Sequence, residues 1–345
     1  MEDILIRQDG RVGRVTLNRP KALNALTYDM VLQLEAALVK WADDPSVSMI
    51  LMDAEGERAF CSGGDIAEMY ATATAGDFDY GRRFWSDEYR LNARIAAYPK
   101  PIVTFLQGFT MGGGVGVGCH GSHRIVGEDA QIAMPECGIG LVPDVGGTHL
   151  LAGGPGRLGE FLGTTGWRMG PADAIRATFA DHFVPQTNWP DLKAELLQHG
   201  DVSAVREAST DPGSSKLAAQ SDLIDTAFAS GTMAMIAEDL ASDGSDFAKD
   251  TLKRLSRPSP LAMDCALILI RAARNQPGVA QALAREYRFT YRSAEHGEFI
   301  EGIRAAIIDK DRTPAWLHNL PADVPPDKPD AMTAHLGAKE WSWEG

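Results

Sequence analysis

The chain has 345 residues, of which 44% are hydrophobic and 23% are charged, a composition typical of a folded globular protein and not of a disordered one. Its 47 acidic and 33 basic residues leave a formal net charge of −14, which argues against a nucleic acid as the main partner, because a phosphate backbone needs a basic face. No apolar run approaches the roughly 20 residues that span a bilayer, and the N-terminus lacks a signal-peptide pattern, so we expect a cytoplasmic protein with no membrane partner.

The N-terminal half of the sequence predicts alternating strands and helices. Residues 4–7 and 12–17 have the pattern of a hairpin around Asp9, and Thr27 can cap a helix that runs to about residue 42. Further strands are predicted at residues 47–52, 101–107, 124–126 and 131–133. Further helices are predicted at residues 66–73, with Asp65 as the cap, and at residues 80–97. This order is typical of an α/β fold.

Glu88 interrupts the apolar face of the helix predicted at residues 80–97. It shares that face with Phe84, Leu91 and Ile95, which lie four residues before it and three and seven residues after it. The acid either points into a polar site or pairs with basic neighbours at the surface, and the sequence alone favours surface pairing. Those basic neighbours are Arg83, Arg90 and Arg94.

Residues 111–118 form a glycine run, Met-Gly-Gly-Gly-Val-Gly-Val-Gly. Glycine loses much conformational entropy on folding, so such a run predicts close backbone approach to a packed element or a ligand. We expect a helix to begin near Gly113 and to aim a backbone N–H at an oxygen that becomes negative during a reaction. One such donor can contribute about 3–4 kcal/mol to a transition state. A second donor could come from the turn at residues 62–64; the alternative is tight helix–strand packing alone.

Residues 134–147 place two acids, Glu136 and Asp144, in an apolar segment rich in glycine and proline, without a basic residue. A carboxylate among apolar neighbours is costly to ionise, and its pKa tends to rise. The pair indicates acid/base or nucleophilic chemistry beside the glycine run. Asp144 alone also suits a turn or helix cap, because it follows a proline and precedes Val-Gly-Gly. Glu136 has no such explanation, because glutamate is a poor cap.

The cysteines and histidines indicate neither disulfides nor a metal site. The four cysteines are widely spaced, which predicts free thiols in a reducing compartment. The histidines form no helical metal-binding pair, and we expect His120 and His123 to be structural. The cysteines are Cys61, Cys119, Cys137 and Cys265.

After about residue 185 the pattern becomes helical. Helices are predicted at residues 192–199, 215–229, 233–241, 260–274 and 279–290. We expect an α/β core over residues 1–190, a helical C-terminal region over residues 191–320 and an irregular tail over residues 321–345.

Several motifs together resemble the crotonase (enoyl-CoA hydratase/isomerase) superfamily. They are residues 18–26, Asn-Arg-Pro-Lys-Ala-Leu-Asn-Ala-Leu; residues 60–66, Phe-Cys-Ser-Gly-Gly-Asp-Ile; and the glycine run. The acidic segment at residues 134–147 and the stretch at residues 301–311 are similar to the 3-hydroxyisobutyryl-CoA hydrolase branch. The resemblance covers nearly the whole chain. It implies a crotonase-like spiral of ββα units, followed by the helical C-terminal region, with an acyl-CoA thioester bound across the core.

The resemblance also implies roles for individual residues. The two N–H groups of the oxyanion hole map to Gly113 and Ser62, and the substrate-contacting acids map to Glu88, Glu136 and Asp144. The segment along the CoA nucleotide maps to Lys21, Ala22, Leu23 and Asn24. No metal and no cofactor is implied, because CoA is part of the substrate. A homo-oligomer is possible, since superfamily relatives are often trimers or hexamers.

One departure from the family pattern favours hydrolysis over hydration. Hydratases use two glutamates; Glu136 matches the second, but the first would fall at Gly116. The extra acid lies instead at Asp144, where hydratases have no carboxylate. The resemblance therefore implies hydrolysis of a short 3-hydroxyacyl-CoA, most simply 3-hydroxyisobutyryl-CoA in valine catabolism. The alternatives are an enoyl-CoA hydratase or isomerase and a non-catalytic acyl-CoA-binding protein.

Overall fold

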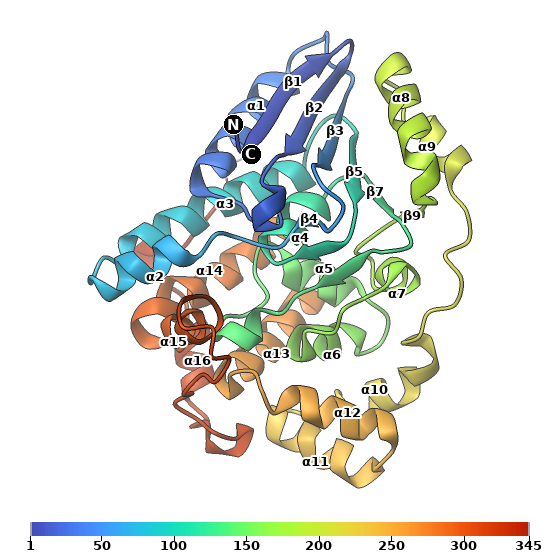
Figure 1. The fold of residues 1–345 in the computed structure, drawn as a ribbon. Helices are drawn as coiled ribbons and strands as arrows, with labels where there is room; N and C mark the ends of the chain where they lie inside the picture. The colour runs from blue at the N-terminus through green and yellow to red at the C-terminus, as the bar shows by residue number, and fades with distance from the viewer. Residues whose placement is uncertain (1, 344–345) are drawn as a thin grey trace.

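The computed structural model describes residues 2–343, whose strands form two sheets (Figure 1). The larger sheet has six strands in the order β1-β2-β3-β5-β7-β9, and the smaller has three in the order β4-β6-β8. The strands are β1 (Ile4–Asp9), β2 (Val12–Leu17), β3 (Met49–Ala54), β4 (Ala59–Cys61), β5 (Ile102–Leu106), β6 (Phe109–Met111), β7 (His123–Val126), β8 (Gln131–Ala133) and β9 (His182–Phe183).

The hairpin predicted at the N-terminus is confirmed. β1 and β2 pair antiparallel, from Ile4 opposite Leu17 to Asp9 opposite Val12. The intervening Gly10 has a φ of +59°, a left-handed conformation that glycine adopts without steric cost. The pairs of strands that follow along both sheets are parallel.

The chain alternates between the two sheets to form the expected spiral of ββα units. β3 and β4, β5 and β6, and β7 and β8 each place the first strand in the larger sheet and the second in the smaller. The helices that follow these pairs are α2 (Ala67–Thr74) with α3 (Asp79–Ala96), then α4 (Gly113–Gly118), then α5 (Gly147–Gly153). The sequence did not predict β4 and β6, because each is short and leads directly into a glycine-rich segment with the pattern of a turn.

Helices cover both faces of the larger sheet (Figure 1). α1 (Tyr28–Ala42) begins as predicted at Thr27, whose side chain accepts a hydrogen bond from the Met30 N–H. On the other face, Trp189, Leu192 and Leu196 of α8 (Trp189–His199) pack on inward-facing strand residues, and α9 (Ser203–Ala208) joins them. The rigid sheet therefore holds the loops at its strand ends in place.

The C-terminal helices pack beneath the same core. α13 (Pro260–Asn275) lies against α5 and α6 (Leu158–Thr165), and α14 (Val279–His296) lies against α3. The larger hydrophobic cluster runs from Ile4 through these helices to Trp341. The division at residues 190 and 320 stays a prediction. No helix within residues 2–343 has the length and apolar character to cross a bilayer.

Three local predictions were wrong, and the sequence also missed helices. The helix expected at residues 215–229 is only α10 (Ser221–Ala227), because buried Asp173 holds the Ser215 hydroxyl and the Leu217 N–H in a turn. Asp65 does not cap α2; it pairs instead with Arg19 at 3.1 Å. The helix α12 (Asp246–Leu255) was not predicted. The tail, expected to be irregular, contains α16 (Lys328–Thr333), which packs on α13 and α14.

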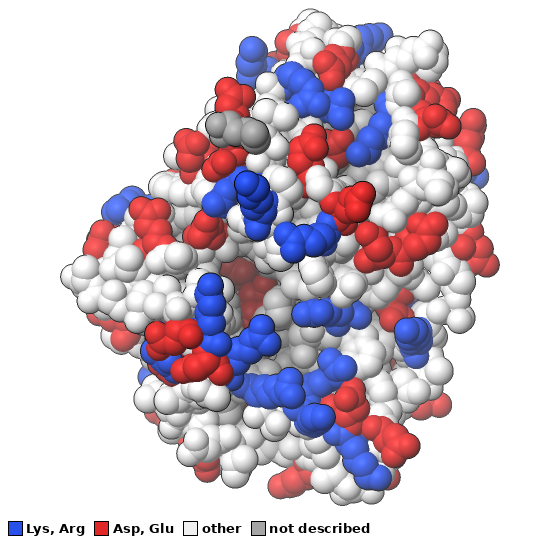
Figure 2. Space-filling model, in the orientation of Figure 1, with Lys and Arg blue, Asp and Glu red and all other residues white. Residues whose placement is uncertain are grey.

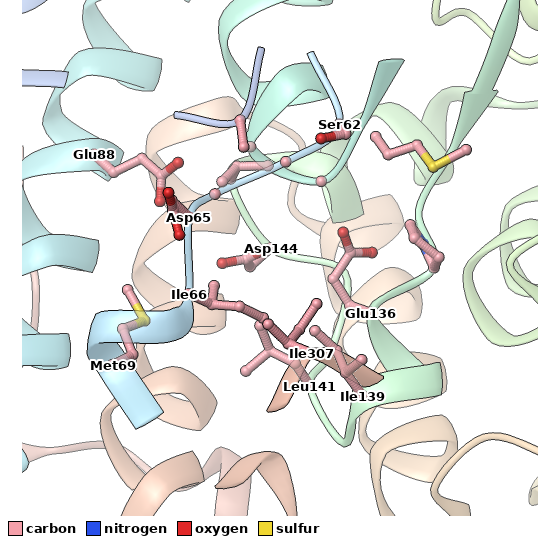
Figure 3. A pocket seen from close by; sticks show the side chains of 18 of the residues that line it. Ser62, Asp65, Ile66, Met69, Glu88, Glu136, Ile139, Leu141, Asp144 and Ile307 are labelled. Atoms are coloured by element: carbon pink, nitrogen blue, oxygen red, sulfur yellow. The ribbon is translucent and has the colours of Figure 1, made fainter. Parts of the chain in front are cut away.

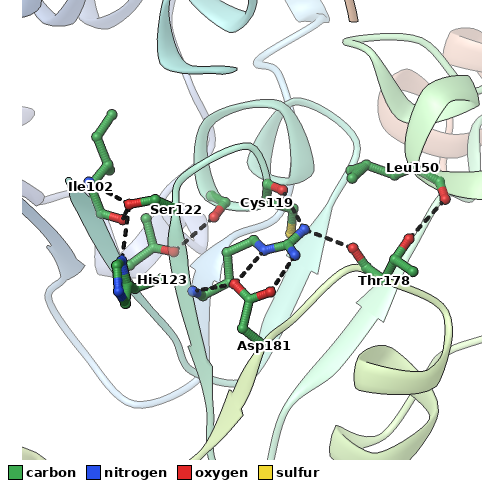
Figure 4. Close-up of polar contacts among 10 residues, drawn as sticks. Ile102, Cys119, Ser122, His123, Leu150, Thr178 and Asp181 are labelled. Carbon is green, nitrogen blue, oxygen red and sulfur yellow. Dashed lines mark hydrogen bonds and ion pairs between the residues drawn. The ribbon is translucent and has the colours of Figure 1, made fainter. Parts of the chain in front are cut away.

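Arg124 on β7 joins the last strand to the core (Figure 4). Its guanidinium donates to both Asp181 carboxylate oxygens, at 2.8 and 2.5 Å, and to the carbonyls of Cys119 and Thr178. Although burial raises the pKa of Asp181, these hydrogen bonds outweigh it and hold the pKa below 3.8. The adjacent His123 bonds Ser122, a structural role as expected.

Candidate active site

A cleft of about 530 Å³ is bordered by loops of the core, by residues of α2 and α3, and by two residues of the C-terminal region (Figure 3). The residues 62–66 after β4, the start of α4 and the acidic segment at residues 135–145 form its walls. Ile307, from the π-helix Arg304–Ile308 that follows α15 (Phe299–Ile303), closes one side. All three predicted substrate-contacting acids line this cleft: Glu88, Glu136 and Asp144.

Two backbone N–H groups converge on the cleft without acceptors of their own. Gly113 is the first residue of α4, so its N–H has no partner within the helix. Among the described residues, neither the Gly113 N–H nor the Gly64 N–H donates a backbone hydrogen bond. A Cβ added to Gly113 would lie 3.2 Å from the Gly64 nitrogen, which shows how near the two donors are. This arrangement suits a single oxyanion.

The predicted donor at Ser62 is not free in this structure, whereas the Gly64 N–H is. The Ser62 N–H donates to the Leu23 carbonyl at 3.0 Å and is unavailable to a ligand. The neighbouring N–H of Asp65 is also used, by the Leu26 carbonyl at 2.7 Å. Gly63, at a φ of +118°, turns the chain between Ser62 and Gly64 and leaves the Gly64 N–H free. Ser62 still lines the cleft.

The later glycines of the run serve close packing, which was the alternative interpretation, while the role of Gly113 as a donor stays a prediction. A Cβ on Gly114 would lie 2.3 Å from the Cys61 carbonyl oxygen, and one on Gly118 would lie 2.7 Å from Leu106. At Gly116 a Cβ would lie 2.7 Å from both Asn92 and Val145. Side chains at these positions collide with the neighbouring strand and helix.

We expect Gly114→Ala to lower the free energy of unfolding by about 1–3 kcal/mol or more, because the added methyl group meets fixed backbone and not a flexible side chain. Urea unfolding measures the change. Gly170→Ala is the matched control, since nothing lies within 4 Å of its Cβ position. Equal stabilities of the two variants would contradict the packing role.

Glu88 is a buried acid and not the surface residue that the sequence favoured. It is 3% exposed, and its Oε1 has no hydrogen-bond partner among the described residues. The neighbouring arginines pair elsewhere, Arg90 with Asp87 and Arg94 with Glu35. Burial, and then the charge of Asp144, raise the pKa of Glu88 well above its usual range. A Cβ on Gly113 would lie 2.9 Å from Glu88 Oε1, so this carboxyl borders the donor pair.

Glu136 lies on the opposite side of Asp144 from Glu88 (Figure 3). It is the first residue of a short 3-10 helix, Glu136–Ile139, and is 5% exposed. Its Oε2 has no partner among the described residues. Burial, followed by the charges of Asp144 and Glu286, raises the pKa of Glu136 well above its usual range. The site thus holds an unpaired carboxyl that can exchange protons.

Asp144 is held in a strained turn that leads into α5. Tyr89 donates its hydroxyl to Asp144 Oδ2 at 2.8 Å. The next residue, Val145, has a φ of +52°, which is a rare conformation for a β-branched residue. His120, which we expected to be structural, bonds the Val145 carbonyl at 2.8 Å. Burial raises the pKa of Asp144 from 3.8 to about 7, although the Tyr89 hydrogen bond opposes the rise.

Sequence reasoning missed a buried acid beside the site, Glu286 on α14. It is fully buried, and burial raises its pKa to about 7, with hydrogen bonds from Thr148 and Gly146 opposing the rise. Within its helix Glu286 follows Arg285 and precedes Tyr287, so the local pattern is that of an ordinary surface residue. The one available signal was its position on the buried face of α14, together with Leu283 and Thr290.

The raised pKa of Asp144 makes stability depend on pH. Between about pH 4 and 7 the folded state keeps a proton that the unfolded state has released, so each rise in pH favours unfolding. Asp144→Asn removes this dependence. We expect its stability relative to wild type to rise with pH across that window, by at most about 1.4 kcal/mol per pH unit.

Urea unfolding of both proteins at several pH values tests this expectation. Asp181→Asn is the control, because the Asp181 carboxyl has a pKa below 3.8 and is ionised in both states above pH 4.5. Its stability difference from wild type should stay constant from pH 4.5 to 7. A constant difference for Asp144→Asn as well would contradict the raised pKa.

The segment predicted to lie along CoA has two different parts. Lys21 and Ala22 are exposed, and Ala22 lines the cleft. Asn24 is buried, and its side-chain amide donates to the Glu55 and Ala59 carbonyls and accepts from the Arg19 N–H. Leu23 and Asn24 both have positive φ, at 51° and 56°. The Asn24 side chain therefore shapes the loop and has no free group for a ligand.

Comparison with known proteins identifies the family. The model of the enoyl-CoA hydratase/isomerase family matches residues 12–333. The chain belongs to this family. A curated relative from Rattus norvegicus, 3-hydroxyisobutyryl-CoA hydrolase, mitochondrial, is 37% identical over 98% of this chain and 90% of its own length. The resemblance to the superfamily and to this branch is confirmed. Because the rat relative is named as mitochondrial, the cytoplasmic location stays a prediction.

Solved structures of the same family have nearly the same fold. One titled an enoyl-CoA hydratase, from Rhodobacter sphaeroides, is 53% identical, with a TM-score of 0.96 over 99% of this chain and 100% of the other. One titled a carnitinyl-CoA dehydratase, from Mycobacterium thermoresistibile, is 39% identical, with a TM-score of 0.95 over 100% of both chains. Family members with this fold thus carry names for different reactions, and the side chains of the site have to distinguish them.

Proposed function

We propose that the chain hydrolyses a short 3-hydroxyacyl-CoA thioester to the free acid and CoA, with 3-hydroxyisobutyryl-CoA as the preferred substrate. The observation that carries the proposal is the unpaired N–H groups of Gly64 and Gly113 beside the unpaired carboxyl of Glu136. The N–H groups stabilise the oxyanion that forms when the thioester carbonyl is attacked. CoA is part of the substrate, and no separate cofactor or metal takes part.

Two routes are open to Glu136. As a base, its carboxylate takes a proton from water, the water oxygen bonds to the carbonyl carbon, and the C–S bond breaks as the thiolate takes up the proton. As a nucleophile, it bonds to that carbon, expels the thiolate and leaves an anhydride that water hydrolyses. Single-turnover hydrolysis in heavy-oxygen water distinguishes them, because label in the enzyme carboxylate supports attack and its absence supports the base.

The other acids complete the polar end of the acyl pocket. Asp144 lies between Glu88 and Glu136, where it holds the 3-hydroxyl group or assists proton transfer. Burial makes Glu88 readily protonated, so it can donate a hydrogen bond toward the acyl oxygen. Apolar side chains that line the cleft, among them Leu141 and Ile307, contact the branched chain of the acyl group.

The charge distribution supports an anionic substrate in spite of the net charge of −14. Figure 2 shows lysines and arginines gathered around the central hollow, with acidic side chains inside it. A second cavity of about 910 Å³ shares Gly138 with the cleft and is lined by Arg257 and Arg312. The reacting end thus lies among acids, and the phosphates lie along the basic rim.

Hydration of an enoyl-CoA is the second candidate, because the solved structure that is 53% identical is titled an enoyl-CoA hydratase. The packing at Gly116 favours hydrolysis. A side chain there meets Asn92 and Val145 before it can reach the cleft, so the first hydratase glutamate has no room. The non-catalytic alternative leaves the unpaired acids and donors without a role.

A panel of CoA esters tests the proposal. We expect thiol release from 3-hydroxyisobutyryl-CoA and weaker release from straight-chain 3-hydroxyacyl esters, since one methyl group changes discrimination by about 1–3 kcal/mol. With crotonyl-CoA, the absorbance of the conjugated thioester should stay constant. Loss of that absorbance without thiol release would replace the proposal with hydration, and saturable binding without either would indicate a binding protein.

A further inference from the structure

Glu286 makes its hydrogen bonds to the turn that carries Asp144. Its Oε2 accepts from the Gly146 N–H at 2.8 Å, and its Oε1 accepts from the Thr148 N–H at 3.0 Å and from the Thr148 hydroxyl. Glu286 is fully buried on α14, while the turn precedes α5. One carboxyl therefore satisfies three donors within four residues of Asp144.

The turn needs such support because its backbone is strained. Val145 and Gly146 both have positive φ, at 52° and 78°. A β-branched residue in the left-handed region persists only where its surroundings hold it in place. Three side chains do so from different elements: Tyr89 at the Asp144 carboxyl, His120 at the Val145 carbonyl, and Glu286 at the N–H groups beyond.

We propose that Glu286 is a positioning residue of the hydrolysis, which holds the strained turn so that Asp144 points into the cleft. This inference rests on the proposed function. Glu286 does not line the cleft and touches no substrate. It acts through Asp144. Because Glu286 lies on α14, a helix of the C-terminal region thus helps to position an acid of the core.

The charge of Glu286 also acts on the acids of the site. The charged and titratable groups that interact with it are Asp144 on the turn, Glu136 on the 3-10 helix, Tyr89 on α3 and Arg285 on α14 itself. The two acids and Glu286 repel one another when ionised, so a neutral residue at position 286 makes Asp144 and Glu136 easier to ionise.

Glu286→Gln tests the role. Glutamine fits the same space, but its amide NH₂ group replaces one carboxylate oxygen, so one of the two backbone N–H groups loses its acceptor. We expect kcat for thioester hydrolysis to fall roughly 10–100-fold, with little change in KM, because the turn moves while the oxyanion donors stay. The acid limb of the pH–rate profile should shift to lower pH. Faster hydrogen exchange at Gly146 and Thr148 should accompany the loss.

A merely structural residue gives a different result. Asp173→Asn is the matched control, since Asp173 is a buried carboxyl that accepts a hydroxyl and a backbone N–H outside the cleft. This variant lowers stability, and it should leave kcat and the acid limb of the pH–rate profile unchanged. Wild-type kcat and an unshifted acid limb in Glu286→Gln would overturn the inference.

Two further measurements keep the test decisive. If Glu286→Gln does not fold, Thr148→Val tests the same contact, because it removes only the hydroxyl donor to Glu286. We expect it to lower kcat by a smaller factor. Unchanged kcat in that variant would overturn the inference. If the wild-type protein releases no thiol from any ester, the proposed function fails first. Hydrogen exchange at Gly146 in the two variants then still decides whether Glu286 holds the turn.

Discussion

Glu136→Gln lowers the rate of thioester hydrolysis by about 10²–10⁴-fold or more, because the amide can neither accept a proton from water nor attack the carbonyl. The wild-type carboxyl is buried and has an unpartnered oxygen that is free to act on the substrate. Glutamine has the same shape, and the cleft keeps its volume. We therefore expect kcat to fall while the affinity for the CoA ester stays close to wild type. Thiol release under saturating substrate measures kcat.

The exposed Glu238 on α11 (Met233–Asp243) supplies the control for this result. Glu238→Gln makes the same chemical change outside the cleft and should hydrolyse at the wild-type rate. Urea unfolding of both variants confirms that each is folded. Turnover of Glu136→Gln close to wild type would remove this residue from the mechanism and leave Asp144 as the remaining candidate base.

Gly64→Pro lowers kcat by about 10²–10³-fold, the loss typical of one missing oxyanion donor. Proline has no N–H, and the Gly64 N–H makes no backbone hydrogen bond in the described residues, so the substitution removes a donor that the fold does not use. The segment around Gly64 pairs with Leu26 by two hydrogen bonds, which involve the Gly63 carbonyl and the Asp65 N–H, and both bonds remain in the variant. The loss should therefore appear in catalysis and not in folding.

Gly64→Ala separates the missing N–H from the added bulk. Its Cβ would lie 3.8 Å from Ile66 and 4.0 Å from Phe84, which are ordinary contacts, and its N–H stays in place. This variant should keep most of the wild-type kcat. Equal rates for the alanine and proline variants would show that the Gly64 N–H does not stabilise the transition state, and the Ser62 assignment would need to be considered again.

Local signals in the sequence predicted the N-terminal half of the fold well. The hairpin at Asp9-Gly10 and the start of α1 at Thr27 depend on residues within a few positions of each other. The same short-range signals failed for β4 and β6, because each of these short strands leads directly into a glycine-rich segment. They also failed at residues 215–229, where contacts to buried Asp173 outweigh the local helical pattern.

The candidate site was predicted in its residue types but not in its geometry. Glu136 and Asp144 stood out because acids in an apolar segment are costly to bury. The residues alone favoured a surface position for Glu88, since a sequence cannot show that Arg90 and Arg94 pair elsewhere; the family resemblance placed Glu88 in the site. Whether the Ser62 or the Gly64 N–H is free to bind a ligand depended on one contact, the hydrogen bond from the Ser62 N–H to the Leu23 carbonyl.

The sequence by itself determined which residues could carry the chemistry and which local elements hold them, because capping, turns and apolar spacing act over a few residues. Only the tertiary structure decided which N–H groups remain unpaired and which acids meet. Glu286 reaches the Gly146 N–H across 140 residues of chain. Such a contact arises from the packing of α14 against α5 and α3, and packing between distant segments leaves no mark in the spacing of the residues that it brings together.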